Sequence, residues 1–263
     1  MTGTSGENTQ AELSASIARH GAYIWETKRI FDVYIETESY DELKSAVLED
    51  NLLRKGSERY RSDILSEITR RYHIAKDGFR ETPLIRAYRR NLSESVWESL
   101  LYYEFSQDRL VKYLTTEFLY PRYQDGVLVL RKEDLLTFLE NASSTRDEFE
   151  SWSENTCLSV AEHYLASMKN FGILEGSTEK EFSYVYPPDQ LVAYILYTLF
   201  EHGHTSADEV VNHTDWRVVL FDQDDVRERL RGISPTHVTY EKRGSVERLE
   251  PRYDSLMECV DEF

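Results

Sequence analysis

The sequence predicts a mainly α protein, a helical bundle with winged helix-turn-helix units that carry short β-hairpins. Three observations support this prediction. Apolar residues recur at helical spacing over most of the chain, and serine or threonine stands where many of the helices would begin. Strand-like stretches with turn residues between them occur at 173–186 and 237–250, and helical segments precede them. A helix followed by a two-stranded hairpin is the final part of a winged helix-turn-helix unit.

The composition indicates a globular protein with a proper core. The chain has 263 residues, of which 40% are hydrophobic and 13% aromatic. Its two cysteines, Cys157 and Cys259, form no CxxC pair and are expected to be free thiols in a reducing cytosol. The polar first ten residues do not resemble a signal peptide, and the apolar run 191–200 is half the length needed to span a bilayer. We therefore expect a cytoplasmic protein.

The organisation predicted from these patterns has three parts. Residues 1–10 are expected to be a disordered tail, 11–142 an N-terminal helical domain of helix-turn-helix type, and 151–263 a C-terminal winged-helix-like domain. The polar segment 143–150 is the best candidate for the boundary between the two domains.

Short helices in succession are predicted for the N-terminal domain. Apolar residues between 12 and 37 recur mostly at helical spacing, with a break near Gly21. Ser39 followed by Glu42 has the pattern of a capping box and starts a short helix. Further helices follow from caps and apolar spacing, with a loop at 121–126 and a short strand at 127–130. The predicted helices are 12–37, 39–48, 57–72, 82–90, 93–105, 107–118 and 132–140.

A helical segment followed by a β-hairpin is predicted to occur twice in the C-terminal domain. Ser153 caps a helix that Gly172 ends, and the first hairpin follows. Ser206 caps a short helix, Asp222 or Asp224 caps the next, and the second hairpin turns at 243–244. The predicted helices are 153–171, 188–202, 206–211, 222–231 and 253–260.

The charge is unevenly distributed, and this carries the functional prediction. Residues 54–90 hold eleven Lys or Arg and five Asp or Glu, a balance of +6 in a chain of formal net charge −17. The other 226 residues therefore carry −23. A basic block in so acidic a chain predicts a polyanion partner, most simply nucleic acid. The alternative is a solvated helix face with intrahelical ion pairs, such as Arg59 with Asp63 and Glu67 with Arg71.

Helix geometry narrows the set of basic residues. At about 100° per residue, Arg59 and Arg70 lie opposite the apolar face, whereas Arg61 and Arg71 fall near it and must pair or snorkel. Charge reversal of Arg59 and Arg70 is expected to weaken DNA binding on all sequences alike. For the second hairpin turn, an ordinary charged tip is favoured over DNA contact. The candidate phosphate contacts are Arg54, Lys55, Arg59, Arg70, Lys76, Arg80, Arg86, Arg89, Arg90, Lys242 and Arg243.

Nothing in the sequence predicts catalysis, a cofactor or a metal site. The chain has no phosphate-binding glycine motif, no HExxH and no GxSxG. His202, His204 and His213 have weak spacing for a metal site and no cysteine near them, so surface or capping roles are expected. Abundant Asp and Glu with scarce Lys fit a cytoplasm of high salt. A purified protein that stays folded and monomeric without salt would contradict this hypothesis.

Three stretches, in their order and spacing, resemble one protein family. They are AYIWETKRIFDVYIETESYDELKSAVLEDNLLRKGSERYRSDILSEITRRY, then WSENTCLSVAEHYLASMKNFGILEG, then WRVVLFDQDDVRERLRGISPTHVTYEKRGSVERLEPRYDSLMECV. Over about residues 15–260 the chain resembles the BrxA family, small proteins of bacteriophage-exclusion (BREX) defence systems. Members have also been labelled as similar to an RNA antitermination factor and as inner-membrane proteins.

The resemblance implies a non-catalytic accessory protein that binds double-stranded DNA. Its implied partners include a methyltransferase, an ATPase and an alkaline-phosphatase-like protein encoded alongside it. Two alternatives remain open, a protein-interaction scaffold within the defence complex and an RNA-binding factor. RNA binding would require exposed aromatic residues beside the arginines. The candidates are Tyr60, Tyr72, Phe79 and Tyr88, and of these Tyr60 and Tyr72 are expected in the core.

Overall fold

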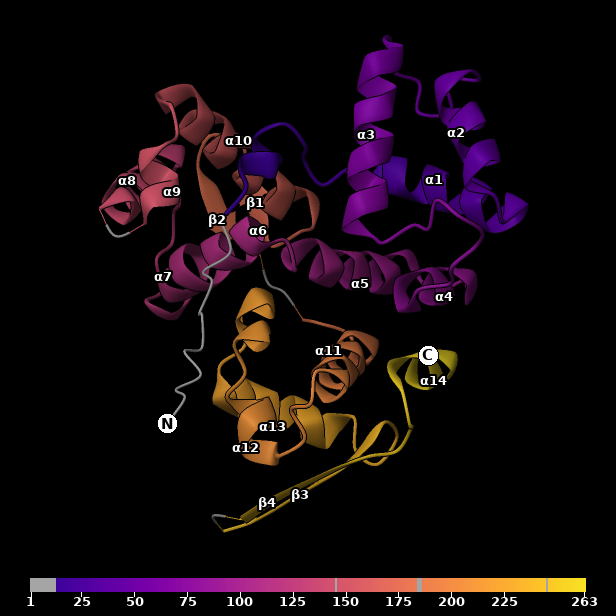
Figure 1. Ribbon diagram of the computed structural model, residues 1–263. Helices are drawn as coiled ribbons and strands as arrows, with labels where there is room; N and C mark the ends of the chain where they lie inside the picture. Colours follow the sequence, from indigo (N-terminus) through magenta and orange to yellow (C-terminus); the bar gives the residue numbers. More distant parts are fainter. Residues whose placement is uncertain (1–12, 145, 184–185, 245) are drawn as a thin grey trace, which may run out of the picture.

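Helices form most of the computed structural model, and two small antiparallel hairpins accompany them (Figure 1). This confirms the predicted mainly α class with short hairpins. The structure describes residues 13–144, 146–183, 186–244 and 246–263, so the predicted disordered tail lies outside the described part. In Figure 1, α1–α3 and α8–α10 form two upper groups, and α11–α14 lie below them.

The four helices predicted from Ser or Thr caps begin where the sequence predicts, whereas the helix predicted from residue 12 begins only at Ile24, after a short 3-10 turn. The hydroxyl groups of Ser39, Ser57, Thr82 and Ser93 each accept a hydrogen bond from the backbone N–H three residues on, which satisfies a donor that the helix cannot pair. The elements are η1 (Ala15–Ala18), α1 (Ile24–Thr37), α2 (Tyr40–Leu48), α3 (Glu58–Arg71), α4 (Pro83–Arg89) and α5 (Glu94–Ser106).

The segment after α5 differs from the prediction. Helical turns run without a break through α6 (Arg109–Tyr113), η2 (Leu114–Leu119) and α7 (Tyr120–Gln124). The predicted loop at 121–126 is therefore wrong for residues 121–124. Pro121 lies at the junction of η2 and α7, where the hydrogen-bonding pattern of the helix changes from π to α. The predicted strand at 127–130 is reduced to one antiparallel bridge between Leu130 and Lys180.

The remaining elements follow the predicted order. A short helix, α9, lies in the polar segment proposed as a domain boundary, and that boundary stays a prediction. Gly172 ends α10 with a φ of 72°, a conformation that glycine adopts without strain. The elements are α8 (Lys132–Ser143), α9 (Asp147–Glu150), α10 (Glu154–Asn170), β1 (Leu174–Gly176), β2 (Lys180–Phe182), α11 (Asp189–Glu201), α12 (Ala207–Val211), η3 (Thr214–Val219), α13 (Gln223–Gly232), β3 (Val238–Arg243), β4 (Val246–Pro251) and α14 (Leu256–Asp261).

A continuous apolar core joins the two halves of the chain. Helix α11 is buried on most sides and packs on α5, where Tyr194 contacts the Tyr103 ring edge-on at 5.9 Å. The Tyr194 hydroxyl donates to Glu104 at 2.6 Å, so its polar end is paired. Within the residues described, no helix has the length and apolarity required to cross a bilayer.

Candidate nucleic-acid interface

The turn between α2 and α3 is held in one shape by hydrogen bonds. The side chain of Asn51 accepts the backbone N–H of Lys55 at 2.9 Å. The guanidinium of Arg61 donates to the carbonyls of Lys55 and Leu48, at 2.9 and 2.6 Å. This confirms the prediction that Arg61 is held by the protein itself. The α2–α3 corner, defined as residues 50–60, is therefore a rigid surface at the start of α3.

Two cations of this corner remain available to a ligand. Arg54 and Arg59 are exposed, and neither forms an ion pair with any residue that the structure describes. The expected pair of Arg59 with Asp63 is not present among them. Lys55 differs, because its Nζ lies 2.7 Å from Glu26. Of the three basic residues here, two present unneutralised charge to the solvent.

Arg70 and Arg71, at the end of α3, act within the protein. Arg70 is exposed as predicted, but its guanidinium contacts Glu67 at 2.7 Å and Asp108 at 3.4 Å. Arg71 is buried, contacts Glu67 at 2.9 Å and donates to the carbonyl of Gly21 at 3.0 Å. This confirms the predicted pairing of Arg71. Both residues attach α3 to neighbouring segments, so neither carries free charge.

The α3–α4 loop and α4 also contain both unpaired cations and cations that are held in ion pairs. Lys76 and Arg80 are exposed without an ion pair in the described chain. Arg86 binds both carboxylate oxygens of Asp261 at 2.6 and 2.8 Å and also Glu81 at 2.7 Å, which ties α4 to α14. Arg89 also contacts Glu81, at 2.7 Å, so Arg86 and Arg89 share this carboxylate. The last of the set, Arg90, donates to the carbonyl of Phe263 at 3.4 Å.

The second hairpin supplies little free positive charge. Lys242 lies 2.8 Å from Glu247, which also contacts Arg227 at 3.0 Å. Burial raises the pKa of Glu247, but Lys242, Tyr240 and Arg227 outweigh it and lower that pKa to about 2. The Arg243 side chain is 87% exposed and lies 3.4 Å from Glu241. An ordinary charged tip remains the better interpretation of this hairpin.

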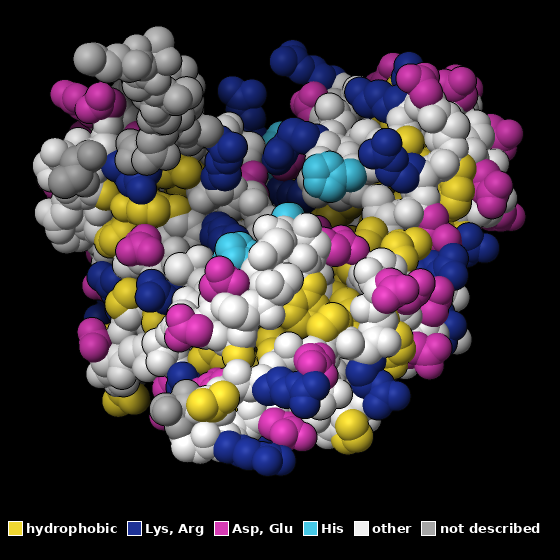
Figure 2. Space-filling view, turned by 60° about the horizontal axis from the view of Figure 1, so that its bottom comes forward, with side chains coloured by type: hydrophobic (Ala, Val, Ile, Leu, Met, Phe, Trp, Pro, Cys, Tyr) yellow, Lys and Arg dark blue, Asp and Glu magenta, His cyan; other side chains and the backbone are white. Residues whose placement is uncertain are grey.

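The eleven predicted contacts are thus spread over several elements rather than gathered in one strip. Six of them form ion pairs, and Arg54, Arg59, Lys76 and Arg80 remain exposed and unpaired within the described chain. Figure 2 shows Lys and Arg mixed with Asp and Glu over much of the face in view. In the same view, Lys, Arg and His side chains border a hollow between the two upper lobes.

A groove beside the α2–α3 corner contains residues that sequence reasoning missed. It has a volume of about 510 Å³ and lies between the start of α1, α3 and one face of α10. Trp25 and Tyr60 line it with 43% and 42% of their surfaces exposed. The prediction that Tyr60 belongs to the core is wrong, because the first turn of α3 faces this groove. Tyr72 is buried as predicted.

A helical wheel could have revealed Trp25. At about 100° per residue, it lies nearly opposite the stripe formed by Ile30, Phe31 and Tyr34. That stripe is buried in the structure, and Trp25 points away from it. Tyr60 gave no such signal, because it continues the apolar stripe of its own helix.

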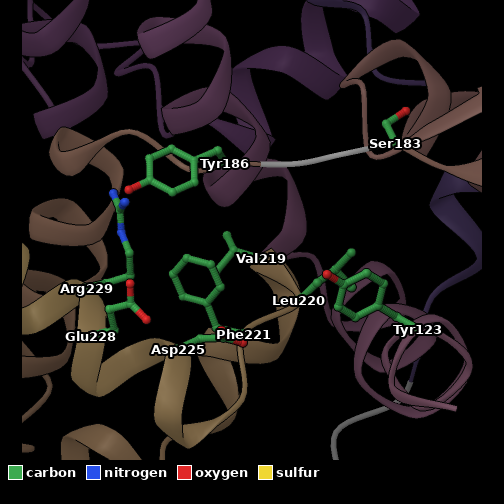
Figure 3. Close-up of a pocket in the computed structure, with 9 residues that line it drawn as sticks. All are labelled: Tyr123, Ser183, Tyr186, Val219, Leu220, Phe221, Asp225, Glu228 and Arg229. Atoms are coloured by element: carbon green, nitrogen blue, oxygen red, sulfur yellow. The ribbon is translucent and has the colours of Figure 1, made fainter. Parts of the chain in front are cut away.

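Another pocket has a different chemistry (Figure 3). Tyr186, Phe221 and Tyr123 surround it, but Asp225 and Glu228 stand at its edge. Its cation, Arg229, is engaged by Asp189 at 2.8 Å and by the carbonyl of Pro187 at 2.6 Å. Asp225 and Glu228 form no ion pair within the described residues and stand beside an arginine that is already paired, which disfavours phosphate, so this pocket does not fit nucleic acid.

The histidines singled out in the sequence lie near a buried carboxylate. The rings of His204 and His213 are 4.5 Å apart, and His213 Nδ1 accepts the backbone N–H of Asp215 at 3.2 Å. Asp215 in turn contacts Lys112 at 2.5 Å and Tyr103 at 2.7 Å. Within the described residues, no three His, Cys, Asp or Glu side chains are placed to hold a metal ion together.

The fold and the site define a class, an α-rich protein with two small hairpins and a partly neutralised basic corner. Residues 11–197 match the model of the BrxA family, which is more than half of the chain, and the protein belongs to that family. It is therefore a protein associated with BREX systems. This confirms the resemblance inferred from the sequence.

Comparison with solved structures supports the fold. An uncharacterized protein from Magnetospirillum magneticum, known from its crystal structure, is similar with a TM-score of 0.59 at 15% identity. The match covers 80% of this chain and 98% of that chain. At this level of identity the likeness concerns the fold alone. No curated protein matches the sequence.

Proposed function

We propose that this protein is a non-catalytic accessory factor of a BREX system that binds double-stranded DNA through its phosphate backbone in the cytoplasm. The observation that carries the proposal is the presence of exposed, unpaired cations in an acidic chain. Arg54 and Arg59 lie at the α2–α3 corner, in the turn and the first turn of the second helix. In helix-turn-helix proteins that part of the second helix approaches the DNA.

Several features support contact with phosphate rather than with base edges. The exposed side chains at the corner include two arginines, whose guanidinium groups match phosphate geometry. The α10 and α13 helices, which precede the two hairpins as in winged units, expose Glu154, Glu162, Asp224 and Glu228. Carboxylates on those helices disfavour their entry into a groove of DNA.

The corner can be tested with Arg54→Glu and Arg59→Glu together. Loss of two phosphate contacts is expected to weaken binding on all duplex sequences and to reduce the slope of log K against log salt by about 2. The measurement is fluorescence anisotropy with a labelled duplex over a salt series. Arg59 with Arg70, the pair suggested by the helical wheel, is a poorer test because Arg70 also binds Glu67 and Asp108.

The matched control is Arg131→Glu with Arg248→Glu. These residues are exposed, lie away from the corner, and change the net charge equally. Each now pairs with one exposed carboxylate, Glu179 and Glu250 respectively. If both double variants bind DNA equally weakly, net charge alone explains the loss and the corner is not the interface.

A protein-interaction scaffold is the second candidate, and one apolar patch favours it. Leu128 is 81% exposed, and Val127 and Tyr123 beside it in sequence are also exposed. Leu128→Glu is expected to reduce co-purification with the methyltransferase, ATPase or phosphatase-like partner while DNA affinity stays unchanged. Unchanged co-purification with all three would count against the scaffold.

A further inference from the structure

The groove beside the α2–α3 corner combines exposed aromatic rings with positive charge. One wall is the segment from Arg19 to Glu26, the other includes Tyr60, and the floor is the face of α10 that carries His163 and Asn170. Trp25 contacts no other aromatic ring among the residues described. Tyr60 has one such neighbour, with its hydroxyl 3.4 Å from the hydroxyl of Tyr23. Two ring faces are thus available in a hollow of about 510 Å³.

The charges around this groove favour an anionic strand. Arg19 lines it, is exposed and forms no ion pair within the described chain. The one carboxylate in the lining, Glu26, is 9% exposed and neutralised by Lys55 at 2.7 Å. With Lys55 counted beside Glu26, the charges at the groove sum to +1, whereas the whole chain carries −17. A phosphodiester backbone would meet attraction here and repulsion over much of the remaining surface.

An unused polar group lies in the floor of the groove. The Ser167 side chain is fully buried, lines the groove, and its hydroxyl has no hydrogen-bond partner. Buried hydroxyl groups are rarely left unpaired in native proteins. One turn further along α10, Asn170 is exposed, and its amide can both donate and accept. These groups suit the polar edge of a base whose face lies on an aromatic ring.

The arrangement fits a single strand rather than a duplex. Bases in a duplex present their edges to a protein, so stacking on an aromatic side chain requires an unpaired base. Tyr60 is the last residue of the α2–α3 corner and also lines the groove, so the groove adjoins the corner proposed to contact DNA.

We propose that this groove binds single-stranded DNA, with an unpaired base stacked on Trp25 and Tyr60 and the strand backbone beside Arg19. The choice of DNA over RNA rests on the proposed function, through the continuity with the α2–α3 corner. Base stacking does not depend on base identity, because every base has a π face. The groove thus accepts an unpaired base of any sequence.

The test compares three probes of about 12 nucleotides, an oligothymidine, a duplex and an oligouridine, by fluorescence anisotropy. Trp25→Ala and Tyr60→Ala are each expected to weaken oligothymidine binding about fivefold to 150-fold, the range for loss of one stacked base. Trp25→Phe keeps a ring and is expected to retain most of the affinity. Duplex binding is expected to stay within about twofold in Trp25→Ala and Trp25→Phe, because Trp25 lies outside the α2–α3 corner.

Two further variants guard against indirect effects. Tyr123→Ala removes an aromatic ring of matched exposure, 41%, outside the groove and is expected to leave the binding of all three probes unchanged. Ala166→Glu adds a carboxylate to the groove floor without removing any core contact, and is expected to abolish oligothymidine binding. Circular dichroism verifies that each variant is folded.

The outcomes separate this inference from the proposed function. If the unsubstituted protein binds duplex but not oligothymidine, or if Trp25→Ala and Ala166→Glu bind oligothymidine normally, the groove is not a strand site and the duplex proposal stands. If neither DNA is bound, both proposals fail. Oligouridine bound tighter than oligothymidine, with the same dependence on Trp25, would overturn the assignment to DNA.

Discussion

Replacing Asp215 by alanine is expected to lower the free energy of unfolding by about 1 to 3 kcal/mol, because the buried Tyr103 hydroxyl would lose its acceptor. Asp215 is 3% exposed and accepts from the Tyr103 hydroxyl at 2.7 Å. Its other oxygen lies 2.5 Å from Lys112 Nζ. Without the carboxylate, the Tyr103 hydroxyl loses its acceptor, whereas Lys112, which is 30% exposed, keeps its hydrogen bond to Gln107 at 3.0 Å. Urea unfolding at neutral pH measures the change.

The same contacts give this effect a pH dependence. Burial raises the pKa of Asp215, but His213, Lys112 and Tyr103 outweigh it and hold that pKa well below its usual value. A carboxyl group with a lowered pKa in the folded state contributes stability above its unfolded pKa, about 3.9, and loses that contribution as the pH falls further. The difference between the two proteins should therefore shrink below about pH 4.

Asp215→Asn and Lys112→Ala complete the experiment. Asparagine preserves the size of the side chain and isolates the charge. In a double-mutant cycle, Asp215→Ala and Lys112→Ala together should cost less than the sum of the single changes, because they share one contact. A difference between Asp215→Ala and the unsubstituted protein that stays constant from pH 7 to pH 3 would contradict the ion-pair explanation.

Arg71→Ala is the second substitution with a large expected effect, about 1 to 3 kcal/mol of unfolding free energy, because the Gly21 carbonyl and the buried Glu67 carboxylate each lose a hydrogen bond. The guanidinium contacts Glu67 at 2.9 Å, donates to the carbonyl of Gly21 at 3.0 Å and lies 4.8 Å over the ring of Phe105. Burial raises the pKa of Glu67, but Arg70 and Arg71 lower it overall. Removal of the Arg71 side chain would leave the buried Glu67 carboxylate paired with Arg70 alone.

Arg59→Ala is the matched control for Arg71→Ala. It removes an arginine from the same helix, but Arg59 is exposed and unpaired in the described chain, so stability should change by less than about 0.5 kcal/mol. The loss of DNA affinity should rank the other way. When both variants are folded, Arg59→Ala should bind DNA more weakly than Arg71→Ala. Equal destabilisation by both changes would mean that Arg71 does not link α3 to the segment around Gly21.

Arg71 illustrates how a basic block can serve two purposes. Its bond to Gly21 holds the segment from Arg19 to Glu26 against α3, and these are the two walls of the groove. Arg70 similarly bridges α3 to Asp108. Part of the positive charge in residues 54–90 therefore holds the walls of the groove together. A smaller part remains unpaired and is available to the proposed DNA partner.

Local patterns were sufficient to predict most of the helices. The Ser57 cap and the Ile64 and Ile68 stripe predicted α3, because both signals depend on residues within one or two turns. The inward role of Arg61 and Arg71 also followed from a helical wheel. Pro121 was misread as the start of a loop, because a proline usually ends a helix, whereas here the helical turns continue past it from η2 into α7.

By itself, the sequence determined the α-rich class, the two hairpins and the presence of a basic block, because these depend on composition and short-range spacing. The resemblance of three long stretches, in their order along the chain, indicated the family. Only the tertiary structure decided which charges of the block are free. Glu26 and Asp261 neutralise Lys55 and Arg86 from 29 and 175 residues away, and no local pattern encodes such pairs. The exposure of Tyr60 was decided in the same way, since a stripe residue is buried only where another segment covers it.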